Sequence, residues 1–171
     1  MAAADTTEIA EQILDFGRNL RRARGRAGLT QAQLSSSTPL DRAAISRLEC
    51  GERAPDMPTL LRLCRALEVA PTDLLRGVGT GASARGAMRR ENGTPGDPAT
   101  VFGANLKWAR GRAGISQERL ALDAKVDRAA ISVYENGGRQ PNLRTVLKLA
   151  LKLEVRPATL LRGIDPKIDG S

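Results

Sequence analysis

The chain of 171 residues contains the same segment twice. Residues 16–77 and 102–163 align without a gap at a constant offset of about 86 residues, and about half of the aligned positions are identical. A copy of roughly 60–70 residues can fold alone, although its core is small. The repeat therefore predicts two small domains, 1–77 and 101–171. The segment between them, 78–100, is rich in Gly, Ala, Ser and Arg and is predicted to be a flexible linker.

Capping residues and glycine stops divide each copy into five short helices, and no segment alternates as a strand. In the first copy, Asp5 is predicted to cap a helix that ends at Gly28, and Thr30, Asp41 and Asp56 are predicted to cap the next three. The second copy has equivalent helix-capping and helix-terminating residues at Gly114, Ser116, Asp127, Gly137, Asn142, Pro157 and Gly163. The expected fold class is all-α.

The formal net charge is +8, and the positive charge lies on the two copies. The first copy carries about +5 and the second about +7, whereas residues 1–15 carry about −4. Two basic helical modules favour a nucleic acid partner over a membrane. No run of 18 apolar residues and no signal peptide is present, so we expect a cytoplasmic protein with no membrane partner.

The residue types argue against an enzyme. The chain has no histidine, which removes the usual general base, the commonest metal ligand and any Ser-His or Cys-His nucleophile pair. Its two cysteines, Cys50 and Cys64, correspond to Asn136 and Ala150 in the second copy, so no disulfide framework or metal site is expected. Cys64 lies on an apolar helix face and is predicted to be core. We expect no catalytic residue, no metal and no cofactor.

A tight helix-turn-helix pair lies within each five-helix copy, and particular residues carry a resemblance to a known family. The first copy has Gly28-Leu29-Thr30-Gln31, Leu34, Ile45-Ser46, Glu49, Gly51 and Pro55, and the second has Gly114-Ile115-Ser116-Gln117, Leu120-Ala121, Ile131-Ser132, Glu135, Gly137 and Pro141. Both copies resemble the phage repressor and Cro-type helix-turn-helix family. The resemblance implies two tandem lambda-repressor-like domains that bind double-stranded DNA.

The resemblance also implies which residues meet DNA. The third helix of each copy fits the major groove, where an arginine can grip a guanine and an alanine can meet a thymine methyl. The implied base contacts are Asp41, Arg42, Ala43, Arg47, Asp127, Arg128, Ala129 and Val133, although a plain N-cap also explains the two aspartates. The implied phosphate contacts are Thr30, Gln31, Arg53, Ser116, Gln117, Lys125 and Arg139. The resemblance further implies partly buried ion pairs, Arg24 with Glu49 and Arg110 with Glu135.

The two copies depart from the family pattern in different ways. The family usually has glycine in the turn before the third helix, whereas the first copy has Pro39 there and the second has Lys125. The first turn is therefore predicted to follow a different path. The third helices differ at Arg47 and Val133, which predicts two similar but unequal half-sites.

The sequence leaves two main functions open, and a nonspecific nucleoid protein is a further alternative that the salt and sequence dependence of binding would reveal. The first is a sequence-specific transcriptional regulator, a repressor, that reads two half-sites on one duplex, since a linker of this length can span the ~34 Å of one helical turn. The second is an antitoxin or adaptor in which one repeat binds a protein partner, with the first repeat favoured because of Pro39 and the acidic leader. The two copies either pair within one chain as a pseudo-dimer or pair with a second chain as a homodimer.

Overall fold

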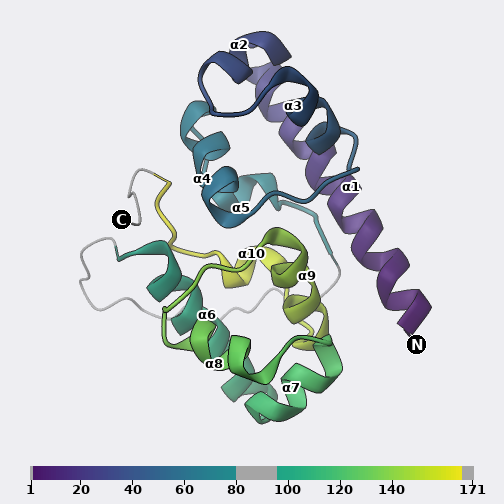
Figure 1. Cartoon of the computed structure of the whole chain (residues 1–171), viewed down its shortest axis with the longest axis vertical. Helices are drawn as coiled ribbons and strands as arrows, with labels where there is room; N and C mark the ends of the chain where they lie inside the picture. The colour runs from purple at the N-terminus through teal and green to yellow at the C-terminus, as the bar shows by residue number, and fades with distance from the viewer. Residues whose placement is uncertain (1, 80–95, 167–171) are drawn as a thin grey trace.

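The computed structural model describes residues 2–79 and 96–166, and over these residues it contains ten helices and no named strand (Figure 1). The all-α prediction is confirmed. The predicted linker falls mostly on 80–95, outside the described residues, and the first helix of the second repeat begins inside the predicted range, at Pro98. The helices are α1 (Ala2–Arg26), α2 (Gln31–Ser36), α3 (Arg42–Glu49), α4 (Met57–Ala66), α5 (Pro71–Leu74), α6 (Pro98–Ala113), α7 (Gln117–Ala124), α8 (Arg128–Glu135), α9 (Leu143–Lys152) and α10 (Pro157–Leu160).

The helix starts follow the predicted caps with one exception. Thr30 forms a capping box with Gln33 at the start of α2, and the Asp56 side chain accepts a hydrogen bond from the Thr59 amide at the start of α4. Asp5 was expected to cap α1, and this is wrong: α1 begins at Ala2 and Asp5 lies inside it. The Asp5 carboxylate is instead bound by Lys152 of the second repeat, a long-range contact that a local capping pattern cannot show.

The aliphatic core includes buried residues of both repeats and one phenylalanine from each. Phe16 of α1 and Phe102 of α6 are fully buried, and Cys64 is buried as predicted. Because burial disfavours the thiolate, it raises the pKa of Cys64 to about 12, so this thiol is chemically inert. Other buried residues of the core include Leu20, Leu34, Ile45, Leu60 and Leu63 in the first repeat and Leu106, Leu120, Ile131, Val146 and Leu149 in the second.

The two repeats pack against each other through equivalent parts. Helix α5 contacts α10, and Asp56 forms an isolated antiparallel bridge with Asn142, where the Leu143 amide donates to the Pro55 carbonyl at 2.9 Å. Asp56 and Asn142 occupy the same position in their repeats, and so do α5 and α10. Contacts between equivalent residues imply an approximate twofold axis between the repeats. Figure 1 shows α2 and α3 at one end of the molecule and α7 and α8 at the other.

Candidate nucleic-acid interface

The third helix of each repeat, α3 or α8, begins at an aspartate cap and lies against the first helix. The Asp41 carboxylate accepts a hydrogen bond from the Ala44 amide at 2.5 Å, and that of Asp127 accepts from the Ala129 amide at 2.6 Å. Both aspartates therefore have the capping role that the sequence allowed. Helix α3 packs on α1 and α2, and α8 packs on α6 and α7, which fixes the angle at which each third helix is presented.

The side chains proposed to reach DNA lie on the solvent side of these helices and of the adjoining turns. Val133 is 41% exposed, which is unusual for a branched apolar side chain and leaves its methyl groups available for contact with a thymine methyl. The exposed predicted contact residues include, besides the four capping residues Thr30, Asp41, Ser116 and Asp127, the basic and small side chains of Arg42, Ala43, Arg47, Arg53, Lys125, Arg128, Ala129, Val133 and Arg139. The fold therefore leaves these basic and small side chains accessible on both repeats.

A buried three-residue network joins the first three helices of the first repeat. Arg24 of α1 donates two hydrogen bonds to the Glu49 carboxylate, from Nε at 2.5 Å and from Nη2 at 3.0 Å. Its Nη1 donates a third hydrogen bond, to the Leu29 carbonyl. Gln31 at the start of α2 donates its Nε2 to the same carboxylate at 2.9 Å. The Glu49 side chain is 3% exposed. The ion pair implied by the family resemblance is therefore present, and it also holds Gln31.

The second repeat builds the same network from Arg110, Glu135 and Gln117. The Arg110 Nε–Glu135 Oε1 distance is 2.6 Å, and Gln117 donates its Nε2 to Glu135 at 2.7 Å. Burial alone would raise the pKa of Glu135, but the hydrogen bonds from Arg110 and Gln117 outweigh it and hold the pKa below its usual range. The pKa of Glu49 is lowered in the same way. Both carboxylates are therefore charged at neutral pH.

The network orients the two glutamines for which the family resemblance implies a phosphate contact. An amide nitrogen carries two hydrogens, so a Gln31 or Gln117 that donates one to glutamate keeps the other for a second acceptor. The hydroxyls of Thr30 and Ser116 cap their helices by accepting from the Gln33 and Arg119 amides. The free amides at the start of a helix favour an anion there.

The turns of the two repeats differ as predicted. Lys125 ends α7 with a φ of 51°, the left-handed conformation that a glycine would adopt without strain. In the first repeat, Ser37 ends α2 in the right-handed region, and Pro39 follows. The hydroxyls of Ser35, Ser36, Ser37 and Thr38 donate to carbonyls of Ala32, Gln33 and Leu34, which satisfies the end of this shorter helix.

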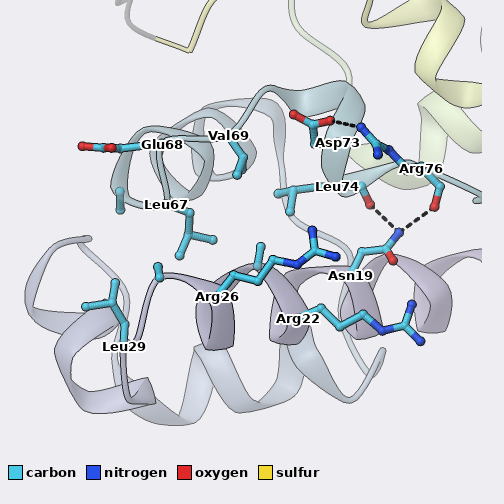
Figure 2. Close-up of a pocket in the computed structure, with 13 residues that line it drawn as sticks. Asn19, Arg22, Arg26, Leu29, Leu67, Glu68, Val69, Asp73, Leu74 and Arg76 are labelled. Atoms are coloured by element: carbon cyan, nitrogen blue, oxygen red, sulfur yellow. Dashed lines mark hydrogen bonds and ion pairs between the residues drawn. The ribbon is translucent and has the colours of Figure 1, made fainter.

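Two equivalent asparagines form tertiary hydrogen bonds that were not predicted from the sequence, and these bonds join the first helix of each repeat to the end of its last helix. Asn19 donates its Nδ2 to the carbonyls of Leu74 and Arg76, and Asn105 does the same to Leu160 and Arg162. Figure 2 shows the Asn19 tie beside a hollow of about 910 Å³ that lies between α1 and the end of α4 and α5. The identity of Asn19 and Asn105 in the two copies was the signal available in the sequence.

The same surface differs between the repeats. Arg22 lines the hollow of the first repeat, whereas the equivalent residue of the second repeat is Trp108. The guanidinium of Arg112 lies 5.1 Å from the centre of the Trp108 ring, a cation–π contact. This contact joins two residues of α6 that lie one turn apart.

The part of the chain that the structure describes contains neither a candidate metal site nor a candidate membrane-spanning helix. Among residues 2–79 and 96–166, no group of His, Cys, Asp or Glu side chains could hold a metal ion. Within the same ranges, no helix combines the length and the apolar character needed to span a bilayer.

The fold and the two matched networks define a protein with two helix-turn-helix domains. A family model described as a helix-turn-helix domain matches residues 15–76, and one described as helix-turn-helix matches residues 106–160. Together they cover most of both repeats. The chain belongs to the helix-turn-helix proteins of the phage repressor and Cro type and carries two such domains in tandem.

Similar proteins cover part of the chain. It is 36% identical over 69 residues, 40% of its length, to the SPbeta prophage-derived uncharacterized HTH-type transcriptional regulator YonR of Bacillus subtilis, and it covers 64% of that protein. It is 34% identical over 63 residues, 37% of its length, to the uncharacterized HTH-type transcriptional regulator YqaE of the same organism, of which it covers 54%. A crystal structure of the restriction-modification controller protein C.AhdI from Aeromonas hydrophila matches 36% of this chain and 94% of that one, with 37% identity and a TM-score of 0.36.

Proposed function

We propose that this protein is a sequence-specific transcriptional regulator that binds double-stranded DNA with both repeats and acts as a repressor by occupying its site. The observation that carries the proposal is the repeated Arg–Glu–Gln network, which joins an exposed third helix and the glutamine at the start of the second helix in each repeat. The net charge of +8 supports a polyanionic partner. The names of the two Bacillus relatives, both HTH-type transcriptional regulators, support the same class.

The packing of the repeats supports two half-sites in inverted orientation. An approximate twofold axis between Asp56 and Asn142 relates α3 to α8, and the backbone of a DNA duplex has twofold axes of its own. One chain would then act as an intramolecular pseudo-dimer on one site. This arrangement is an alternative to a homodimer of two chains, because the contact between α5 and α10 is already made inside the chain.

Within each half-site, the exposed side chains suggest what is read. Arg42 and Arg128 each suit a guanine, with about 1–3 kcal/mol of discrimination against another base, and Ala43 and Ala129 suit a thymine methyl. Arg47 and Val133 occupy the same position and differ in chemistry, since one donates hydrogen bonds and the other offers only methyl groups. We therefore propose two similar half-sites that differ at the base pair facing this position.

The adaptor alternative has lost one of its supports. The acidic leader was one reason to expect a protein partner on the first repeat, but the leader carboxylate of Asp5 is bound by Lys152 within the chain. The other reason, the turn containing Pro39, changes the path of α2 without burying Arg42 or Arg47, which remain exposed.

The proposal is tested by selecting duplexes from a random pool and measuring their affinity for the wild type and for Arg128→Ala. Loss of a bidentate guanine contact should weaken binding to the selected site by about 10- to 100-fold and relax the preference at one position. Arg162→Ala is the matched control, because it removes the same charge from an exposed side chain of the same repeat.

A second variant separates base reading from backbone contact. Lys125→Ala should weaken all sequences alike and reduce the slope of log affinity against log salt by about 0.9. If the random pool yields no preferred sequence, or if Arg128→Ala binds every duplex as tightly as the control does, the proposed reading by α8 is wrong.

A further inference from the structure

Helix α1 extends well beyond its own domain. It begins at Ala2, whereas α6, the equivalent helix, begins at Pro98, which corresponds to position 12 of the first repeat. The leader as used from here on is residues 2–11, the part of the acidic segment 1–15 that has no helical equivalent at the start of α6. Figure 1 shows α1 continuing past the first repeat toward the second, with the N-terminus beyond α9, and α1 contacts α9. The leader is therefore a rigid helical arm that reaches from one domain to the other.

The leader is attached to the second repeat by an apolar contact and an ion pair. Ile9 is 3% exposed, and with Thr6 and Asp5 it lines a hollow of about 280 Å³ closed on the other side by α9 and the end of α7. The Asp5 carboxylate lies 2.6 Å from the Lys152 Nζ, and these side chains are 35% and 21% exposed. Burial of one isoleucine together with a partly buried ion pair is a specific anchor rather than a loose contact.

The charges at this junction explain why an acidic side chain stands at position 5. Four cations of the second repeat line the same hollow, and its own carboxylate there, Asp123, is already paired with Arg119 at 2.8 Å. Asp5 supplies the missing negative charge from the other domain. The four cations are Lys125, Arg144, Lys148 and Lys152.

The sequence provides the residues of this anchor once and does not repeat them at the equivalent positions. Under the offset of the repeat, Ile9 corresponds to Pro95 and Lys152 corresponds to Ala66, so the sequence repeats neither the apolar side chain nor the cation. At a second contact between the repeats, the Arg65 guanidinium binds the Pro166 carbonyl with Nε at 3.1 Å and Nη2 at 2.9 Å. These two different contacts thus add to the bridge between Asp56 and Asn142 and to the contact between α5 and α10 in holding the domains in one relative position.

We propose that the leader is a brace that sets the separation of α3 and α8 and thereby determines the half-site spacing that the protein accepts. Asp5, Ile9 and Lys152 are then positioning residues for spacing specificity, although none of them touches a base. The inference rests on the proposed two-headed DNA binding. A tethered pair of domains without a brace tolerates a range of spacings, whereas a pair that is rigidly held gains affinity at one spacing and loses it at the others.

The test uses full-length protein and a series of duplexes in which the selected half-sites are moved apart or together by one base pair at a time. For the wild type we expect a sharp affinity maximum at one spacing. Asp5→Lys places a fifth cation among four and should flatten the profile, so that spacings off by one to three base pairs come within about threefold of the best. Asp5→Lys combined with Lys152→Asp should restore the sharp maximum.

Asp15→Lys is the matched control. It makes the same change of charge on the same helix and breaks an exposed ion pair with Arg18, a residue of α1 itself. It should raise nonspecific affinity as Asp5→Lys does and leave the spacing profile sharp. Ile9→Ala is a second variant of the brace that changes no charge, and it should flatten the profile as well.

A readout without DNA separates this inference from the proposed function. Spin labels at Ser36→Cys and Leu122→Cys, in a Cys50→Ser background, report the distance between the ends of α2 and α7, both exposed. We expect a narrow distance distribution that broadens in Asp5→Lys and narrows again in the double variant. A wild type that binds no duplex would contradict the proposed function. An unchanged distribution and an unchanged spacing profile in Asp5→Lys and Ile9→Ala would overturn the brace alone.

Discussion

Gly103 of α6 lies where the first helix of the second repeat meets the end of the third. A Cβ at this position would collide with the Tyr134 carbonyl oxygen and lie 3.0 Å from the Glu135 oxygen. Because both obstacles are backbone atoms, α8 itself would have to move. We expect Gly103→Ala to lower the free energy of unfolding by about 1–3 kcal/mol, the usual range for overpacking, and to weaken DNA binding further by tilting α8. Urea unfolding and affinity for the selected site measure the two effects.

Gly111→Ala gives the control on the same helix. Nothing lies within 4 Å of a Cβ at this exposed position. Alanine favours a helix over glycine, so stability should rise by about 0.5–1 kcal/mol. Equal gains of stability from Gly103→Ala and Gly111→Ala would show that helix propensity rather than close approach decides the effect.

Glu135 is the residue at which stability should depend most clearly on pH. We expect Glu135→Gln to cost about 3–5 kcal/mol at pH 7, because it leaves the Arg110 guanidinium largely buried beside a neutral partner. The folded pKa of Glu135 lies below its usual value of about 4.3. The stabilisation is therefore present above the unfolded pKa and is lost as the pH falls through the folded pKa.

The measurement is the difference in unfolding free energy between the wild type and Glu135→Gln from pH 7 down to pH 3. This difference should shrink on the acid side of the unfolded pKa. Asp123→Asn breaks the exposed Arg119–Asp123 pair and should change stability by less than about 0.5 kcal/mol at every pH. A difference that stays constant down to pH 3 would argue against a charged Glu135 in the network.

At the scale of the elements, the turn between α7 and α8 contains Lys125, whose backbone conformation lowers stability and whose side chain is proposed to contact DNA. Lys125 holds a φ of 51°, a conformation that costs a side chain with a Cβ about 1–2 kcal/mol. Lys125→Gly should therefore raise the unfolding free energy by about 0.5–1 kcal/mol, the gain being reduced by the greater freedom of glycine in the unfolded chain. It should at the same time weaken DNA binding, since it removes a proposed phosphate contact.

A thermal melt and a binding titration of Lys125→Ala separate the effect of the backbone strain on stability from the effect of the lost charge on DNA binding. This variant loses the same charge and keeps the strained Cβ, so binding should weaken as in Lys125→Gly without the gain in stability. If both variants melt at the same temperature, the left-handed conformation carries no measurable strain.

Local chemistry explains why most elements could be predicted from the sequence. The caps at Thr30, Asp41 and Asp56 and the stop at Gly28 act within one turn of their helices, so the residues beside them suffice. The Arg24–Glu49 pair came from a family resemblance and not from spacing. The hydrogen bond from Gln31 to Glu49 was missed because it joins the ends of two helices whose relative position depends on packing.

At the scale of the whole molecule, prediction from sequence failed where one repeat meets the other. The leader was expected to begin at a local cap, and its acidic character was interpreted as a surface for a protein partner. Its binding partner, Lys152, lies 147 residues away in the other repeat. The bridge between Asp56 and Asn142 also joins residues that are far apart in sequence, and capping alone already accounts for both residues. Long-range contacts of this kind follow from the docking of two finished domains, on which helix patterns carry no information.

The docking of the two repeats predicts that one chain binds one inverted DNA site. A protein whose heads are related by a twofold axis matches the DNA backbone in the same way at both half-sites only when these are inverted. We expect the selected half-sites to bind at least about tenfold more tightly as an inverted repeat than as a direct repeat of the same spacing, because in the direct repeat one head loses its base contacts.

Native mass spectrometry of the complex checks the stoichiometry behind this expectation. The complex should contain one chain of 18.3 kDa per duplex, and the free protein should be a monomer. Two chains per duplex would mean that the repeats pair between chains. Equal affinity for the inverted and direct arrangements would mean that the domains separate on DNA, and then the contacts at Asp56, Asn142 and Asp5 would belong to the free protein only.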